Sequence, residues 1–249
     1  MRDMPLVRVG SLMLLLVFGS GVGWISSSIS LATPTSSDVT GAPRIPTYKA
    51  PRASSPRARI GGHPRGSDRD APHLIALVPD HIGFTLKSNP SLCWYLSQST
   101  TRPVQFTILD SRGIRPLVEQ PLSSPTHPGF QCISLHDYGI DLKEQEPYRW
   151  FVTLVLDPSR PSRDVVAGGM IERVAFDEAC ALGMPCSKAA CDREAVYQYA
   201  ESGLWYDAIG CLMELMQHNG DSPFLQPLLK GMLGQVGIHL PDGVGSLSK

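Results

Sequence analysis

Short apolar runs separated by turn residues occupy residues 73–175, and this pattern restricts the fold more than any other feature of the chain. Val104, Phe106 and Ile108 alternate with polar residues, which is the period of a strand with one solvated face. Residues 148–156 are apolar on both faces, so we expect a central strand there. Further strands are expected at residues 74–78, 92–96, 115–120, 129–135 and 165–174, with a hairpin turn at 110–113. About seven short strands at this spacing predict an all-β antiparallel sandwich with an immunoglobulin-like architecture.

After Phe176 the spacing of apolar residues becomes helical. The residues at spacings of three to five are Ala195, Tyr199, Leu204, Ala208, Leu212 and Leu215. Gly203 is placed to end one helix in the left-handed conformation. Asp207 falls in the first turn of the next helix, where a carboxylate suits the helix dipole. The spacing predicts a small helical subdomain over residues 176–240 and a flexible tail over 241–249.

The last helix of this subdomain is expected to be weak. Pro227 precedes it, and it spans residues 228–236. Gly231 and Gly234 lower its helix propensity, but glycines also allow close packing.

The N-terminus has the three parts of a secretion signal. Arg2 and Arg8 form a basic region, residues 9–22 carry no charge, and Ala32 ends a stretch of small residues of the kind that signal peptidase reads. We therefore expect a signal peptide over residues 1–32 and a protein exported to the periplasm or the cell exterior. The alternative is an uncleaved anchor, for which the apolar run is near the short limit.

Residues 33–72 are rich in Pro, Ser, Arg and Gly, which predicts a flexible linker because little apolar surface offsets the cost of ordering the backbone. Residues 33–70 hold seven Lys and Arg against three Asp, a net charge of +4, whereas residues 71–249 hold thirteen against nineteen acidic residues, a net charge of −6. The basic linker could contact an anionic envelope polymer or another envelope protein, or serve only as a spacer. The acidic body argues against nucleic acid as a partner. Contact with a membrane is expected only through an uncleaved N-terminus.

The six cysteines are Cys93, Cys132, Cys180, Cys186, Cys191 and Cys211. An even number in an exported protein favours disulfides. Cys93 and Cys132 both lie in the middle of expected strands, and neighbouring or facing strands can bring two cysteines within bonding range, so we expect them to pair. The alternative is that both are buried, unbonded small apolar side chains. The other four are expected to pair among themselves in an undetermined order. A four-cysteine metal site is the alternative, but the spacing lacks the paired cysteines of structural zinc sites.

No other motif predicts a specific chemistry, so we expect no catalytic, cofactor-binding or metal-binding residues. His136 and Asp137 could form half of a hydrolytic triad, but the chain has no G-x-S-x-G motif to supply the nucleophile. Asp141, Glu144 and Glu146 lie near them in an acidic loop that lacks the residue order of a calcium loop. No zinc helix, phosphate loop or dinucleotide motif is present.

The helical spacing is similar to that of one tetratricopeptide unit; the matching residues are Tyr199, Gly203, Trp205, Ala208, Leu212 and Leu215. A wider resemblance rests on residues 59–62, 74–79, 148–150, 157–159 and 199–208. Through these motifs residues 59–240 resemble a bacterial exported family known as domain of unknown function nine-two-eight. The resemblance implies export and a two-part layout, and it implies no activity.

We expect a non-enzymatic binding or scaffold module of the cell envelope or periplasm. The alternatives are an envelope hydrolase that uses His136 with nearby carboxylates, and a purely structural envelope component. A tetratricopeptide groove needs about three stacked units, and only one is present. The helical subdomain is therefore expected to dock on the sandwich through Trp205 and other apolar residues instead of binding a peptide.

Overall fold

The computed structural model describes residues 44–50, 58–61, 72–123, 127–175, 177, 190–219 and 222–240. These residues belong to one compact unit. The expected signal peptide, the expected C-terminal tail, Cys180 and Cys186 lie outside the described residues. Within the described ranges, no helix has both the length and the apolar character that a membrane crossing requires.

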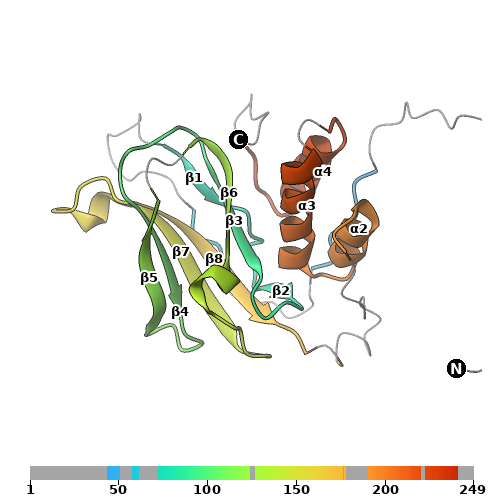
Figure 1. Ribbon diagram of the computed structural model, residues 1–249, viewed down its shortest axis with the longest axis horizontal. Helices are drawn as coiled ribbons and strands as arrows, with labels where there is room; N and C mark the ends of the chain where they lie inside the picture. Colours follow the sequence, from blue (N-terminus) through green and yellow to red (C-terminus); the bar gives the residue numbers. More distant parts are fainter. Residues whose placement is uncertain are drawn as a thin grey trace, which may run out of the picture. The chain divides into compact units, whose positions relative to one another are not determined.

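The strands form two sheets (Figure 1). The three-stranded sheet has the order β1 (Leu74–Ala76), β3 (Ser91–Leu96) and β6 (Gly129–Ser134). The five-stranded sheet has the order β2 (Gly83–Thr85), β8 (Val165–Arg173), β7 (Pro147–Leu154), β4 (Val104–Leu109) and β5 (Pro116–Leu122). Two short 3-10 helices, η1 (Leu135–Tyr138) and η2 (Pro161–Arg163), follow β6 and β7.

The periodicity of the strands agrees with the sequence. Val104, Phe106 and Ile108 of β4 are buried, and the residues between them are partly exposed. The run that contains Trp150 forms β7, which lies between β4 and β8 and is therefore central, as predicted. Alternation identified β4 because one of its faces points toward the core. Strand β7 was recognised instead by its continuous apolar run, although its burial also alternates.

Strand β2 was not predicted, and it pairs with β8 in parallel, so the expectation of purely antiparallel sheets is wrong at this pair. Three residues are too few to show a period. Gly83 begins the strand, and a Cβ at this position would lie 2.6 Å from the Tyr206 ring. The chain therefore has two mostly antiparallel sheets, and a helix packs against the edge strand.

Three helices follow the strands in the described part of the chain: α2 (Arg193–Glu201), α3 (Trp205–Asn219) and α4 (Leu225–Gln235). Gly203 has a φ of 79° in the turn after α2, as predicted. Helix α4 begins three residues earlier than expected, with Pro227 inside its first turn. Proline is tolerated there because the first N–H groups of a helix have no partner within the helix.

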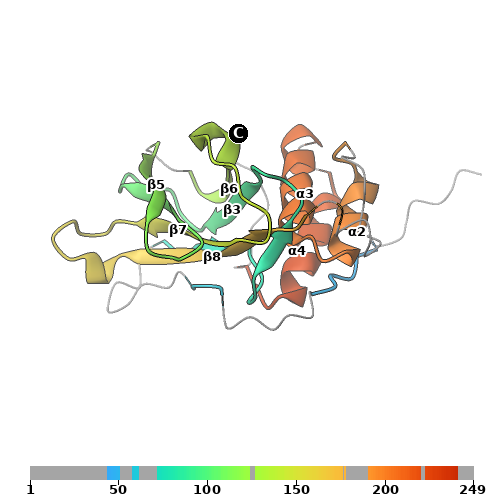
Figure 2. The same cartoon turned by 90° about the horizontal axis from the view of Figure 1, so that it is seen from below.

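The helices dock on the strands, as predicted, and share one apolar core with both sheets (Figure 2). The indole Nε1 of Trp205 donates to the carbonyl of Leu77 at 2.8 Å. Trp150 Nε1 donates to Tyr206 Oη at 2.9 Å, and that hydroxyl donates to the carbonyl of Met170 at 3.0 Å. These buried bonds fix the start of α3 against strands of the five-stranded sheet and the segment after β1.

Two stretches of the segment predicted as a linker lie on this fold, and we call residues 44–50 and 58–61 the arm. Tyr48 packs edge-on against Trp205, with ring centroids 4.8 Å apart. Ile60 and Gly168 exchange two backbone hydrogen bonds of 2.9 and 3.2 Å, which adds a bridge to β8. The arm therefore differs from a solvated spacer, because these apolar side chains and backbone groups have partners in the body.

Candidate functional site

Two adjoining clefts lie where the arm, β1 and the end of α4 meet. One has a volume of about 250 Å³ and is lined by arm residues 59–61, by Ile75 and Ala76, and by residues 237–239. The other has a volume of about 410 Å³ and is lined by Lys230, by residues 233–234 and by residues 238–240. The two clefts share Ile238 and His239, so we treat them as one site, the α4 cleft.

Arg59 joins the walls of this cleft. Its guanidinium Nη1 donates to the carbonyl of Val236 at 2.9 Å and to the carbonyl of Val78 at 3.3 Å. The first bond satisfies a carbonyl at the C-terminus of α4, where a cation is also favoured by the helix dipole. Gly237 then turns the chain with a φ of 70°, a conformation that glycine adopts without strain. Arg59 also lines the cleft, so a partly buried structural contact holds one wall of the site in place.

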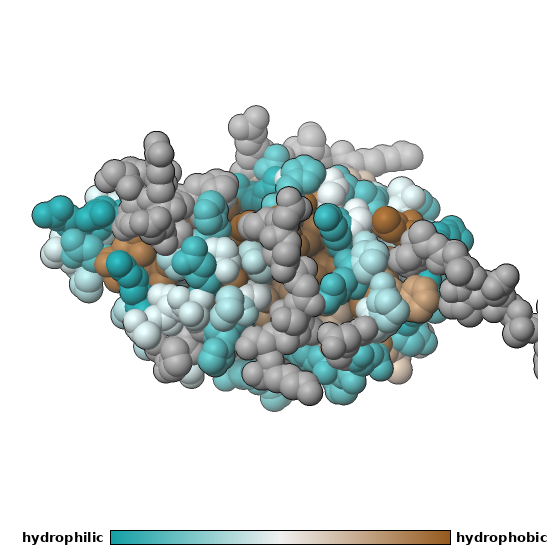
Figure 3. Space-filling view, turned by 90° about the horizontal axis from the view of Figure 1, so that it is seen from above, coloured by the Kyte–Doolittle hydropathy of each residue, from teal (hydrophilic) through white to brown (hydrophobic). Residues whose placement is uncertain are grey.

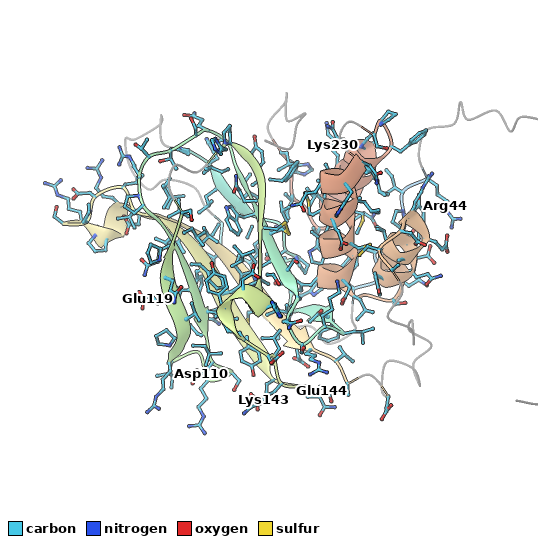
Figure 4. The ribbon with its side chains drawn as sticks, viewed as in Figure 1. Arg44, Asp110, Glu119, Lys143, Glu144 and Lys230 are labelled. Atoms are coloured by element: carbon cyan, nitrogen blue, oxygen red, sulfur yellow. A yellow bond between two sulfur atoms is a disulfide. The ribbon has the colours of Figure 1, made fainter. Side chains whose placement is uncertain are left out.

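The lining of the α4 cleft has one sign of charge. Among the residues that the structure describes, the walls of the cleft contain the cations Arg59 and Lys230 with His239 beside them, and no acidic residue. Lys230 also lies far from Asp110, in the turn after β4, and from Glu119 on β5 (Figure 4). In a body with a net acidic charge, this site is a local region of positive potential.

The remaining wall of the cleft is apolar. Leu233 and Ile238 are buried beneath it, and Ile75 is half-buried at its side. Apolar surface next to cations is the arrangement that accommodates a carboxylate or phosphate attached to a hydrocarbon portion.

The face in Figure 3 is mostly hydrophilic, with small and separate hydrophobic patches, so this face shows no broad apolar docking surface outside the grey atoms.

The arm also fixes α4 from its other side. The Gln235 side-chain amide donates to the carbonyl of Pro46 at 2.8 Å, and its oxygen accepts the Tyr48 N–H at 2.9 Å. A Cβ at Gly231 would lie 2.3 Å from Ile45 Cδ1, so the close approach expected of this glycine is made by the arm. Gly234, by contrast, has no atom of the described residues within 4 Å of such a Cβ, and it lines the cleft.

Cys93 and Cys132 form a disulfide, as predicted. They are register partners on β3 and β6, with Cα atoms 4.2 Å apart. A disulfide of this kind is characteristic of proteins from oxidising, non-cytoplasmic compartments. Among the other candidates, Cys191 and Cys211 carry free thiols next to each other, while Cys180 and Cys186 fall outside the described residues.

The residues considered for hydrolysis or calcium binding are solvent-facing or paired. His136 Nδ1 lies 3.8 Å from Asp137 Oδ1 on η1, with both side chains mostly exposed. Glu144 pairs with Arg173 at 3.1 Å. In the part of the chain that the structure describes, no three or more His, Cys, Asp or Glu side chains are grouped so that they could hold a metal ion.

A buried carboxylate is the feature that sequence reasoning missed. Asp207 occupies the first turn of α3, as expected, but its side chain is buried and accepts the Leu86 N–H at 2.9 Å. Burial raises its pKa from the usual 3.8 to about 6. The available signal was its place among apolar residues of helical spacing, between Leu204 and Ala208.

The comparison with protein families gives one match. A family model described as "Domain of Unknown Function (DUF928)" matches residues 60–242. No curated protein and no solved structure matches the chain. The family resemblance seen in the sequence is therefore confirmed.

Proposed function

The chain belongs to the family described as Domain of Unknown Function (DUF928), and we propose that this protein is an exported, non-enzymatic binding module. Its α4 cleft holds an anionic group, a carboxylate or a phosphate, of an envelope polymer or envelope protein. The observation that carries this proposal is the charge of the lining: the described wall residues include Arg59 and Lys230, with His239 beside them, and no acidic residue.

An anion should bind more tightly in the α4 cleft than beside an isolated lysine on the surface. Arg59 is held by two carbonyls, so less of its side-chain entropy is lost when a ligand arrives. The apolar wall excludes water on one side, and a cation–anion contact is stronger there than in bulk solvent. The apolar wall also selects against small, fully hydrated anions, because they would leave it uncovered.

Export is supported by the Cys93–Cys132 disulfide and by the secretion-signal pattern predicted for residues 1–32. Hydrolysis has no comparable support, because His136 and Asp137 are exposed and have no nucleophile in a matching motif.

A titration with a pair of amphiphiles tests the proposal. The full chain is titrated calorimetrically with decyl phosphate and with decyl maltoside, which has the same tail and a neutral head group, both below their micelle concentrations. We expect the phosphate alone to bind, and Lys230→Glu to weaken its binding at least about tenfold, because it places a like charge beside the ligand. Added salt should also weaken binding.

Lys143→Glu is the matched control, since Lys143 is an exposed lysine that lies far from Lys230 (Figure 4). It should leave the affinity for decyl phosphate unchanged. Equal binding of the maltoside, or an equal loss in the Lys143→Glu protein, would contradict an anion site in the α4 cleft.

We also propose a finer description of the fold. The two sheets form an immunoglobulin-like sandwich, and α2 with α3 form one tetratricopeptide-like pair. Support comes from the short antiparallel strands and from the turn at Gly203 between two packed helices. An experimental structure compared with both architectures would test this description.

A further inference from the structure

A pair of thiols lies between helices α2 and α3. Cys191 immediately precedes Asp192, the N-cap residue of α2, whose side chain accepts the Ala195 N–H at 2.7 Å. Cys211 lies on the inner side of α3 and is fully buried. Its Sγ is 3.8 Å from the backbone carbonyl of Asp192, the residue that follows Cys191, so the two thiols are neighbours.

We propose that Cys191 and Cys211 are a specific dithiol that closes to a second disulfide, which fastens the start of α2 to the middle of α3. This pair is separate from Cys93 and Cys132, which are already bonded to each other across β3 and β6. The N-cap holds the backbone next to Cys191 in place, and α3 holds Cys211, so both sulfurs are positioned by ordered elements.

The reaction is a thiol–disulfide exchange, and its oxidant is a small-molecule or protein disulfide. The Cys191 thiol loses its proton and attacks one sulfur of the oxidant, which releases the first thiol and leaves a mixed disulfide on Cys191. The Cys211 thiol then loses its proton and attacks Cys191 Sγ, which releases the second thiol. Two thiols of the protein become one disulfide, and the two electrons reduce the oxidant to two thiols.

Exposure sets this order of steps. Cys191 is half-buried, whereas Cys211 is fully buried, so an oxidant in solution reaches Cys191 first. Burial raises the pKa of both thiols, and most strongly that of Cys211. Lys87 acts in the opposite direction on both, because its positive charge favours the thiolates, while Glu214 opposes it. The resulting reactivity is that of a slow structural bridge, not of an activated redox centre.

Tryptic peptide mapping of the full chain separates the possible pairings. Cleavage after Arg173, Lys188, Arg193 and Lys230 places Cys191 on residues 189–193, Cys211 on residues 194–230, and both Cys180 and Cys186 on residues 174–188. The protein is secreted into an oxidising compartment, purified without reductant, alkylated after denaturation and digested. We expect peptides 189–193 and 194–230 to be joined, with two hydrogens fewer than their sum. A link from either peptide to residues 174–188, or alkylation of both Cys191 and Cys211, would overturn the proposal.

Single and double serine variants distinguish a bond from packing. If the two sulfurs are joined, Cys191→Ser should remove most of the stabilisation, and adding Cys211→Ser should lower the melting temperature little further. For a loop of about 20 residues in a chain of this size, the expected shift is roughly 6–12 °C. Reductant at a concentration that leaves Cys93–Cys132 intact should lower the wild-type melting temperature by the same amount.

Metal analysis covers the remaining alternative. A zinc ion bound in stoichiometric amount by the purified protein, lost together with the stability on addition of a chelator, would show that these cysteines are ligands and not a disulfide. Absence of zinc together with the joined peptides is the expected result.

Discussion

In the two sheets, neighbouring strands bond one another along continuous ladders, whereas the helices are fixed to them by single residues from distant parts of the chain. The ladder between β7 and β8 joins eight residue pairs, and a disulfide adds a covalent link between β3 and β6. At the start of α3, by contrast, Trp205, Tyr206 and Asp207 each bond a different segment of the strand-rich half. The strands are thus held together by many similar backbone hydrogen bonds. The start of α3 is held to the strands by a few side-chain hydrogen bonds that differ from one another.

This difference means that the two halves should respond differently to single substitutions. Loss of one pair from a ladder leaves its neighbours in place, but loss of one residue from the start of α3 removes a contact with no equivalent. The predictions below are ordered from the largest expected effect to the smallest.

Trp205→Ala should have the largest effect, a loss of about 3–5 kcal/mol in the free energy of unfolding. The ring is fully buried, and its removal leaves the Leu77 carbonyl without its indole donor. Because the helices share the core of the sheets, both halves should unfold in one transition, followed by circular dichroism in denaturant. Leu117→Ala on the exposed edge strand β5 is the control and should change stability by less than about 0.5 kcal/mol. A stable helical signal in the Trp205→Ala protein would show that the helices do not depend on this joint.

Replacing both Cys93 and Cys132 by serine should cost about 4 kcal/mol, as a loop of 39 residues is no longer closed in the unfolded chain. The cost should fall on the whole molecule, because β3 contacts both β1 and α3. In a protein that also carries Cys191→Ser and Cys211→Ser, chemical reduction of Cys93–Cys132 in the same denaturant series should give the same value. A loss confined to local opening at β6 would mean that the ladders hold the three-stranded sheet without the bridge.

Asp207 should make the joint between helices and strands sensitive to pH. Its pKa is raised from 3.8 to about 6 in the folded protein, so the folded state binds this proton more tightly than the unfolded chain does. The stability it contributes is fully present below about pH 4 and is lost as pH rises through about 6, a change on the order of 3 kcal/mol. Asp207→Asn can still accept the Leu86 N–H but does not titrate.

The quantity to measure is therefore the difference in unfolding free energy between wild type and Asp207→Asn. Unfolding free energies of wild type and Asp207→Asn are taken across this range, and wild type should lose stability relative to the variant as pH increases. The serine variant of Cys93 and Cys132 should keep its difference from wild type constant over the same range. A constant difference for Asp207→Asn would indicate that Asp207 is ionised at all these pH values.

Two glycines of α4 give the smallest and most closely matched comparison. Gly234→Ala should stabilise the protein by about 0.5–1 kcal/mol, because the new methyl group meets open space and helix propensity improves. Gly231→Ala should lose stability by about 1 kcal/mol, because the methyl group displaces Ile45. Release of the arm should also speed tryptic cleavage after Lys49. Equal behaviour of the two variants would mean that the arm contributes nothing to α4.

The parts of the fold that the sequence predicts are those with a local period. The alternation of Val104, Phe106 and Ile108 and the spacing around Gly203 each reflect one element facing one core, so they can be read without knowledge of the rest. Cys93 and Cys132 could be paired because both fall in the middle of strands. β2 could not be found, because its three residues are defined by their neighbours and not by a pattern.

The α4 cleft could not be predicted for a related reason. Arg59, Ile75 and Lys230 come from three segments, and each looks ordinary in its own segment. The burial of Asp207 and the approach of Cys191 to Cys211 also arise from the packing of α3 against elements distant in sequence. The motif at residues 59–62 contributed only to the family resemblance, and residues 33–72 were predicted as one linker.

The parallel pairing of β2 with β8 sets the order in which the chain can fold. Gly83 lies opposite Ile171, so 88 residues separate two neighbours in one sheet. Closing such a long loop costs entropy before any bond is gained, which slows folding. A ribosome that has released only the first half of the chain has produced the edge strand but not its neighbour. The edge strand β2, and the helix α3 that packs against it, can therefore take their places only after the last third of the chain has been synthesised.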